Sequence, residues 1–396
     1  MTLPQAVHEL EFGHGSRYGK EEQDAVLEVL RASAPSCGPW VKRFEEAFAT
    51  FCGTQYGLAV TSGTTGLQLA MIAVGVGPGD EVITTPVSWV ATANAAAVLG
   101  AKMVFADVDP NTLNLDPASV KEKITPRTKA ILPVHLYGQC SDMDTLNELA
   151  RPRKIRVVED AAHAAGAEYK GRKAGSLGDI GVFSFHQQKN MVTLGEGGMI
   201  TASDRSLYER MLSYRSLCCR TYDPKGKYLP LDESVLPMGK RYWHLDFDDV
   251  GFNYRMTDVQ AAVGLVQLRK LNSLNARRIE IAEKYSAGLQ GIRGLTLPFV
   301  SPDNHHVFHV YTVLLEDSFA RTKEDFMWDL YTAKRIKAWS HYMPIHLTTA
   351  YRKLGHKQGE CPVAEKLFER YVSIPIHPRM TDEVVQYVID SIRELS

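Results

Sequence analysis

The sequence predicts an α/β fold, in which a large domain has a mainly parallel seven-stranded sheet flanked by helices and a smaller C-terminal domain is α+β. Seven short runs rich in β-forming residues occur in the first half of the chain, and most are bounded by Gly, Pro or Asp. Segments compatible with helices separate many of these runs, which indicates βαβ units and a sheet covered on both faces. The runs are 56–63, 80–86, 102–109, 129–138, 155–163, 179–185 and 197–203.

Helices are predicted before the first strand and between several later ones. Residues 21–33 have apolar side chains at helical spacing, and this helix ends before Pro35. A second amphipathic helix covers 40–53 and is closed by Gly53. The helical segments between strands include 64–75, 90–100 and 143–152.

The chain changes in character near residue 250, and we place a boundary there between a large domain, 1–250, and a small domain, 251–396. Residues 216–250 are irregular, and a loop of that length inside a compact domain is usually functional or mobile. An irregular entry into a long amphipathic helix follows at 251–271. The other predicted elements of the small domain are a helix at 275–290, a strand at 305–315, a helix at 323–333, a loop at 341–349 and a closing helix at 382–395.

Composition excludes several classes of function. The 396 residues are 44% hydrophobic and 23% charged, as in an ordinary soluble globular protein. The formal net charge is −1 with both signs interspersed, so we expect no nucleic-acid partner. There is no long uncharged apolar run, and the first residues lack a basic region followed by an apolar one, so we expect no membrane partner.

The cysteines and histidines do not form a metal-binding pattern. The six cysteines lack metal-type spacing and are expected to be free thiols, which favours a cytoplasmic location. His305, His306 and His309 lie in a strand pattern without matching Cys or carboxylate ligands. We therefore expect no metal site.

Lys189 is the first candidate for chemistry. It lies in a polar loop between two buried segments, within the stretch from Phe183 to Ile200. A lysine that is removed from water loses its proton more readily and becomes a nucleophile for carbonyl groups, as Schiff-base chemistry requires. A solvated loop lysine is the commoner alternative, so this residue needs support from elsewhere in the chain.

Three further motifs fall where strands end, which is where ligands bind to parallel sheets. The stretch from Ser62 to Gly66 follows a strand and begins a helix, so it forms either an anion site or a simple N-cap. Asp160 ends another strand, with His163 three residues later, and is either a buried functional carboxylate or a helix N-cap. Trp89 either stacks on a planar ligand or fills the core.

Together these signals point to pyridoxal 5′-phosphate. This cofactor needs a lysine for its aldehyde, a carboxylate for its ring nitrogen, an anion site for its phosphate and an aromatic cover for its ring. Lys189, Asp160, the 62–66 turn and Trp89 supply one of each. Each signal is modest alone, but their combination in one α/β chain is strong.

The chain also resembles the DegT/StrS-type sugar aminotransferases, a branch of the fold-type-I pyridoxal-phosphate enzymes. The resemblance rests on SGTTG, TTPVSW, VVEDAAHA, SFHQQK followed by GEGG, and GFNYRMTDVQAA, and it extends from about Tyr18 to the C-terminus. It implies that Lys189 binds the cofactor covalently and then moves the proton. It further implies that Asp160 pairs with the ring nitrogen and that His163, where Gln is also common, lies near the phenolic oxygen.

The resemblance also implies how the cofactor and substrates are held. Trp89 stacks on the ring, and Thr64, Thr65 and Ser184 hold the phosphate. Asn253 reaches the phosphate in a neighbouring subunit, so a homodimer with active sites at the interface is expected. The residues themselves indicate that the 216–250 segment is either a substrate wall or a solvated loop, and further substrate candidates lie near the small domain. These candidates are Tyr222, Lys227, Arg241, Tyr242, Trp243, His244, Arg255, His341 and His346.

The predicted reaction follows from that family. Glutamate or glutamine donates the amino group, and a keto sugar, first of all a nucleotide-linked one, accepts it in amino-sugar biosynthesis. One alternative is an aminotransferase for a keto-cyclitol or a related secondary-metabolite precursor. Another is a non-catalytic regulator or sensor that retains the fold. The presence of Lys189 argues against relatives that carry His at this position and perform deoxygenation.

Overall fold

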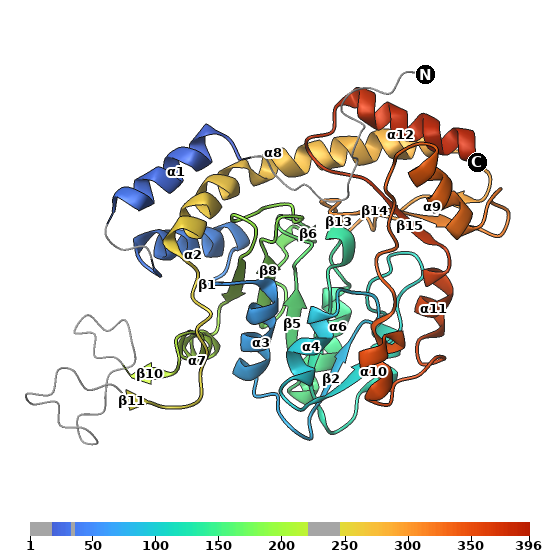
Figure 1. Ribbon diagram of the computed structural model, residues 1–396. Coiled ribbons are helices and arrows are strands. Elements are labelled where there is room, and N and C mark those ends of the chain that lie inside the picture. Colours follow the sequence, from blue (N-terminus) through green and yellow to red (C-terminus); the bar gives the residue numbers. More distant parts are fainter. Residues whose placement is uncertain (1–17, 33–35, 221–245) are drawn as a thin grey trace, which may run out of the picture.

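The computed structural model describes residues 18–32, 36–220 and 246–396 (Figure 1). Its centre is a seven-stranded sheet with the order β1-β9-β8-β5-β4-β2-β3. All seven predicted strand runs supply one strand of this sheet, so the predicted α/β fold is confirmed. The strands are β1 (Tyr56–Val60), β2 (Glu81–Thr84), β3 (Lys102–Phe105), β4 (Thr128–Leu132), β5 (Arg156–Asp160), β8 (Ile180–Ser184) and β9 (Gly198–Ala202).

The sheet is parallel except at β9, which pairs antiparallel with both β1 and β8. No helix intervenes between β8 and β9, so the chain returns directly beside the strand that it has just left. Ser184 and Gly198 are paired at the start of this return. The loop between them, 185–197, carries Lys189 and lies at the carboxyl end of β8.

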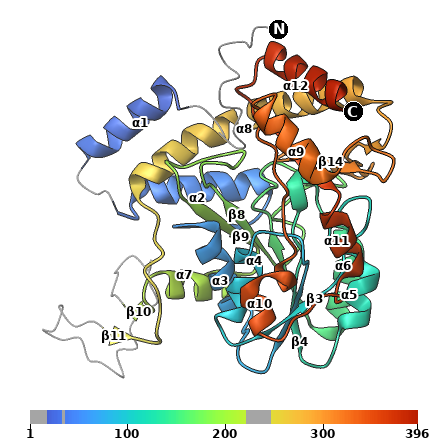
Figure 2. The same ribbon diagram turned by 45° about the vertical axis from the view of Figure 1, so that its right-hand side comes forward.

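Helices cover both faces of the sheet (Figure 2). Alternate strand residues point to opposite faces, and they enter two different hydrophobic clusters: Val158 and Val182 join one, whereas Val157 and Phe183 join the other. Helices α3, α4 and α7 cover the first face, and α2 and α6 cover the second. These helices are α2 (Pro39–Cys52), α3 (Gly63–Ala73), α4 (Ala91–Ala97), α6 (Met143–Ala150) and α7 (Arg205–Arg215), and α5 (Pro117–Lys123) precedes β4.

Helix α8 (Asp258–Leu289) joins the two parts of the chain and is drawn in yellow in Figure 1. The sequence indicated helical segments at 251–271 and 275–290, but in the structure they form one uninterrupted helix. Its first half packs with α1 (Lys20–Arg31) and α2. In its second half, Ile281 and Tyr285 belong to a third hydrophobic cluster, which forms the core of the C-terminal part and is called the third core below. One continuous helix thus contributes to packing in both parts of the chain, and the domain boundary at residue 250 stays a prediction.

The third core lies between a small sheet and helices α8, α9 and α12. The predicted strand 305–315 is divided between two sheets: its beginning pairs with β6, and its end is the central strand, β14, of the small sheet. Between them, His309 donates its backbone N–H to the Tyr137 carbonyl. The bounds are α9 (Lys323–Thr332), α12 (Asp382–Leu395), β6 (Glu168–Tyr169), β7 (Arg172–Lys173), β12 (Leu295–Thr296), β13 (Asn304–His305), β14 (Tyr311–Leu315) and β15 (Tyr371–Ile374).

Between α9 and β15 the chain returns to the large sheet. Helices α10 (Thr349–Lys353) and α11 (Pro362–Phe368) pack there, where Tyr351 and Ala364 join the cluster that covers β2 and β4. This return brings residues 339–343 to the carboxyl ends of the sheet strands. A further pair, β10 (Cys219–Arg220) and β11 (Asp246–Phe247), forms a separate two-stranded sheet.

Three further findings concern membrane-spanning helices, cysteines and metal sites. No helix within the described ranges is both long and apolar enough to cross a membrane. The cysteines are all free thiols. Among the residues with described positions, no cluster of three or more His, Cys, Asp or Glu could hold a metal ion.

Candidate active site

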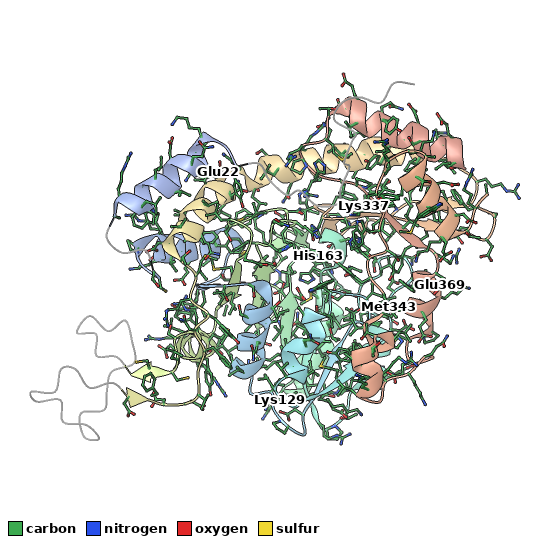
Figure 3. All side chains as sticks on the ribbon, viewed as in Figure 1. Glu22, Lys129, His163, Lys337, Met343 and Glu369 are labelled. Atoms are coloured by element: carbon green, nitrogen blue, oxygen red, sulfur yellow. The ribbon has the colours of Figure 1, made fainter. Side chains whose placement is uncertain are left out.

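A cavity of about 730 Å³ lies at the carboxyl ends of the sheet strands. Figure 3 labels His163 near the centre of the molecule, where the large sheet meets the C-terminal elements. The cavity is lined by residues that the sequence predicted and by others that it did not. The predicted ones are Thr64, Trp89, Asp160, His163, Ser184, Lys189 and His341.

Asp160 is buried at the last position of β5, where the strand delivers its carboxylate into the cavity. Thr92 Oγ1 donates to Asp160 Oδ2 at 2.7 Å, and the backbone N–H of Ala162 donates to Oδ1 at 3.1 Å. Burial raises the pKa of the Asp160 carboxyl above its ordinary value, while these hydrogen bonds and the Lys189 charge oppose part of that rise. The carboxylate is therefore positioned to pair with a cationic ligand atom.

Lys189 lies in the loop that joins β8 to β9, and its backbone N–H donates to the His186 carbonyl at 2.8 Å. The next residue, Asn190, anchors the loop because its amide donates to Asn275 Oδ1 at 2.9 Å and to the Val307 carbonyl at 3.1 Å. Burial lowers the pKa of the Lys189 ammonium to about 8, although the negative charge of Asp160 acts against that shift. Near neutral pH the neutral, nucleophilic amine is thus far more populated than in an ordinary lysine, although the ammonium form still predominates.

The start of α3 lies beside Ser184. Ser62 caps the helix by accepting the Thr65 N–H at 3.2 Å, while the amides of the first turn have no acceptor within the helix. A Cβ atom at Gly63 would lie 2.9 Å from Ser184 Cβ, so glycine permits the close approach of helix and strand. Thr64 and Ser184 both line the cavity. Ser62 is therefore an N-cap, and the anion site at this turn stays a prediction.

His163 is buried beside two other rings. Its Nε2 lies 3.3 Å from the Tyr342 hydroxyl, and its ring centroid is 4.3 Å from that of His309. Burial lowers the pKa of His163 well below its ordinary value, and the Lys189 and His341 charges act in the same direction. His163 Nδ1 has no hydrogen-bond partner among the residues that the structure describes. A neutral imidazole with one unused nitrogen thus faces the cavity.

Trp89 is 62% exposed and lines the cavity, and its ring centroid lies 6.2 Å from that of Tyr342 in an edge-to-face arrangement. Of the two alternatives for this residue, a place in the core is wrong, and stacking on a planar ligand stays a prediction. The chain leaves β2 through Pro86 and enters α4 just after Trp89, so the indole sits on the turn at the sheet edge. An exposed aromatic face remains available for a planar ligand.

Residues 339–343 form a cavity wall that the sequence did not predict as such. Trp339 pairs with Ser373 of β15 through two backbone hydrogen bonds, and the Tyr371 hydroxyl donates to the Tyr342 carbonyl. The buried Lys323 donates to Ser340 Oγ at 2.8 Å. Only the string HYMPIH hinted at this wall, because its approach to the sheet depends on how the two parts of the chain pack.

Four predicted residues of the described structure, Thr65, Asn253, Arg255 and His346, do not line the cavity. Thr65 Oγ1 donates to the Ser62 carbonyl at 2.9 Å, and Asn253 and Arg255 belong to a segment bridged to Ser216 and Val60. His346 is fully buried, with Nε2 2.8 Å from Glu365 Oε1. Their predicted roles stay predictions, as do those of the residues outside the described part of the chain. These are Tyr222, Lys227, Arg241, Tyr242, Trp243 and His244.

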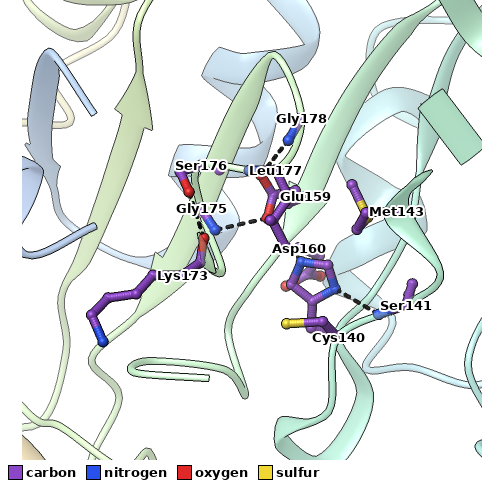
Figure 4. Close-up of polar contacts among 12 residues, drawn as sticks. Cys140, Ser141, Met143, Glu159, Asp160, Lys173, Gly175, Ser176, Leu177 and Gly178 are labelled. Carbon is purple, nitrogen blue, oxygen red and sulfur yellow. Dashed lines mark hydrogen bonds and ion pairs between the residues drawn. The ribbon is translucent and has the colours of Figure 1, made fainter. Parts of the chain in front are cut away.

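Glu159, the residue before Asp160 in β5, is buried on the opposite face of the sheet and links β5 to the turn at 175–178. Its carboxylate accepts hydrogen bonds from the backbone N–H groups of Gly175, Leu177 and Gly178 at 2.6–2.7 Å, and Figure 4 shows it pointing into this turn. His135 Nδ1 accepts the Ser141 N–H, so Nε2 carries a hydrogen and donates it to Glu159 at 2.8 Å. Every hydrogen bond that holds this carboxylate therefore comes from a fixed donor.

Glu159→Gln is expected to lower the free energy of unfolding by about 3 kcal/mol or more. The side-chain amide of glutamine has an NH2 group where the carboxylate has an acceptor oxygen. This NH2 group would face the N–H donors that now bind Glu159, and buried N–H groups would be left without an acceptor. Urea unfolding of the variant measures the loss. Glu168→Gln, which removes only a partly exposed ion pair with Lys173, is the matched control and should cost at most about 1 kcal/mol. Equal losses in the two variants would contradict this account of Glu159.

The model of the DegT/DnrJ/EryC1/StrS aminotransferase family matches residues 16–393. The chain belongs to this family. GDP-perosamine synthase of Caulobacter vibrioides is 39% identical over 96% of each chain. The dTDP-3-amino-3,4,6-trideoxy-α-D-glucose transaminase of Streptomyces venezuelae is 36% identical, covering 94% of this chain and 92% of its own. The structure is also similar to Spr1654 of Streptococcus pneumoniae in its PLP form, with a TM-score of 0.87, 27% identity and coverage of 97% and 98%.

These findings confirm the predicted family and the predicted fold type I, and with them the assignment of the protein as a transaminase. The family match covers the sheet, the 62–66 turn, the Lys189 loop and the C-terminal wall alike. These findings disfavour the alternative of a non-catalytic regulator. The cavity also retains the buried carboxylate of Asp160 and Lys189 with its lowered pKa.

Proposed function

We propose that this protein is a pyridoxal-phosphate-dependent aminotransferase that moves an amino group from glutamate or glutamine to a keto sugar linked to a nucleotide. The observation that carries the proposal is the meeting of Asp160 and Lys189 in one cavity at the carboxyl edge of the sheet. The relatives support the sugar class, because two of them are named for nucleotide-linked sugars, one with GDP and the other with dTDP.

The residues of the cavity fit the cofactor. The volume of about 730 Å³ lies within the roughly 300–1,000 Å³ typical of small-molecule sites. Ser184, Thr64 and the first amides of α3 would hold the phosphate, and the exposed Trp89 would cover one ring face. Asp160 would pair with the ring nitrogen, and the unused His163 Nδ1 offers one further polar contact. The PLP form of Spr1654 supports the same cofactor.

When bound, pyridoxal 5′-phosphate supplies an aldehyde for amine exchange and a ring that accepts electrons. The chain supplies the rest. Lys189 Nζ, whose lowered pKa of about 8 makes the neutral amine more accessible than in an ordinary lysine, accepts the proton that leaves the α-carbon of the amino donor and later delivers one to the acceptor carbon. The fixed negative charge of Asp160 holds a proton on the ring nitrogen, and the residue 339–343 wall limits the access of water.

Asn253 supports a homodimer whose active sites lie at the interface. It is exposed and outside the cavity of its own chain, although it belongs to the GFNYR string of the family resemblance. Phe247 and Val250, just before it, are exposed apolar side chains. In the proposed dimer this segment covers the partner's cavity and brings Asn253 to its phosphate. The free cysteines further support a reducing cytoplasm as the location.

The test is to incubate the purified protein with pyridoxal phosphate and to reduce it with borohydride, which should attach the cofactor mass to the peptide that contains Lys189. Glutamate and glutamine are then assayed separately against nucleotide-linked keto sugars and against inososes. Amination of a nucleotide-linked keto sugar is the expected result. Amination of an inosose alone would overturn the acceptor class, and failure to attach the cofactor would overturn the proposal as a whole.

A further inference from the structure

A buried chain of hydroxyl groups ends on the Asp160 carboxylate. Thr92, only 1% exposed, lies in the first turn of α4, and its Oγ1 is 2.7 Å from Asp160 Oδ2. The Ser88 Oγ is 2.7 Å from Thr92 Oγ1 and is also buried. All three residues line the cavity.

The direction of these hydrogen bonds follows from the number of hydrogens. An ionised carboxylate only accepts, so Thr92 must donate its single hydroxyl hydrogen to Asp160. Because the hydroxyl hydrogen of Thr92 already binds Asp160, the Ser88 hydroxyl must donate to Thr92 Oγ1. With the Ala162 N–H on Oδ1, each oxygen of Asp160 meets one fixed donor from the chain. Successive bonds of this kind polarise and strengthen one another.

The side-chain direction of Thr92 points to more than local capping. A threonine in the first turn of a helix commonly bonds backbone groups nearby. Thr92 instead reaches across to β5, to a carboxylate 68 positions away in the sequence. If Thr92 only stabilised the fold, any buried acceptor would satisfy its hydroxyl group. Its acceptor is instead Asp160, the carboxylate that faces the cofactor ring in the proposed site.

We propose that Thr92, supported by Ser88, is a positioning residue that fixes the orientation and the ionised form of Asp160 for the ring nitrogen of the cofactor. This inference rests on the proposed function. Burial disfavours the charged form of Asp160. In this proposal the hydroxyl groups of Ser88 and Thr92 counteract that effect and keep the carboxylate ionised.

The charges around Asp160 give the direction of the effect. Burial raises the pKa of this carboxyl, the Thr92 hydrogen bond is the first contribution that lowers it, and Ala162, Lys189 and His135 follow. The Tyr342 hydroxyl lies within reach of the same charge, because burial and then the Asp160 charge raise its pKa. Without the Thr92 hydroxyl the pKa of Asp160 rises further, so the carboxylate takes up a proton at a higher pH and cofactor binding is lost earlier on acidification.

The experiment measures the dissociation constant of pyridoxal phosphate by quenching of tryptophan fluorescence as a function of pH. Thr92→Val should weaken binding at neutral pH by roughly 10- to 100-fold, since a hydrogen bond to a charged group contributes about 1.5–3 kcal/mol. Its acidic limb should also move to higher pH. Thr92→Ser should restore both properties, and Ser88→Ala should give a smaller change in the same direction.

Thr84→Val is the matched control. Thr84 is equally buried, at the end of β2, but its hydroxyl donates to the Leu132 carbonyl at 2.7 Å and not to Asp160. It should leave the pH dependence of binding unchanged. A Thr92→Val protein that binds with the wild-type affinity and pH profile would overturn the inference while leaving the proposed function intact. A wild-type chain that does not bind the cofactor would overturn both.

Discussion

Lys189→Ala is expected to abolish amino transfer, with a loss of at least about 10³-fold in turnover, because positioned proton transfer alone contributes about 10²–10⁴-fold. The variant also lacks the amine that reacts with the cofactor aldehyde. Nothing else in the loop needs to change, since the loop is held by the Asn190 side chain and by backbone bonds. Single-turnover formation of the keto acid from glutamate measures the loss.

The control for this variant is Lys170→Ala, which removes an exposed lysine paired with Asp144 outside the cavity and should keep wild-type turnover. The wild-type protein should show a matching pH dependence. Because the pKa of Lys189 is about 8, the rate of covalent cofactor attachment should rise with pH and level off above that value. Near-normal turnover of Lys189→Ala, or a rate of attachment that falls as pH rises to 8, would contradict the assigned role.

Asp160→Asn is expected to have the second largest effect, a loss of about 10²–10⁴-fold in turnover with weaker cofactor binding. An amide of the same size carries no charge, so it cannot hold a proton on the ring nitrogen, and the ring accepts electrons less readily. The substitution also disturbs local bonding. The carboxylate oxygens accept from Thr92 and from Ala162, and the Asn amide nitrogen would face one of these donors.

Asp116→Asn provides the comparison for Asp160→Asn. Asp116 caps α5 by accepting the Ala118 and Ser119 N–H groups, and asparagine is an equally good N-cap. That variant should match the wild type in stability and turnover, as measured by thermal unfolding and the steady-state rate. Asp160→Asn with turnover close to that of Asp116→Asn would show that the carboxylate charge is not required.

The alternation of β-rich runs with helical segments was enough to predict the α/β fold from the sequence alone. Each β-rich run became a strand of the large sheet because buried parallel strands need apolar residues on both faces, a pattern that is written locally. Because ligands bind at the carboxyl ends of parallel strands, the sequence also located Asp160 at that edge, where it shares the cavity with Lys189. Where local patterns were weaker, the prediction lost detail: the strand 305–315 divides between two sheets, and one helix spans the expected break near 271–275.

Tertiary packing decided the rest of the site. Trp89 is exposed, His346 is buried against Glu365, and neither outcome is visible in the residues beside them. Tyr342 reaches His163 across 179 positions of sequence, and Thr92 reaches Asp160 across 68. A sequence pattern reports which face of an element is apolar. Which polar groups then meet depends on how whole elements pack, and that is set by the burial of distant side chains.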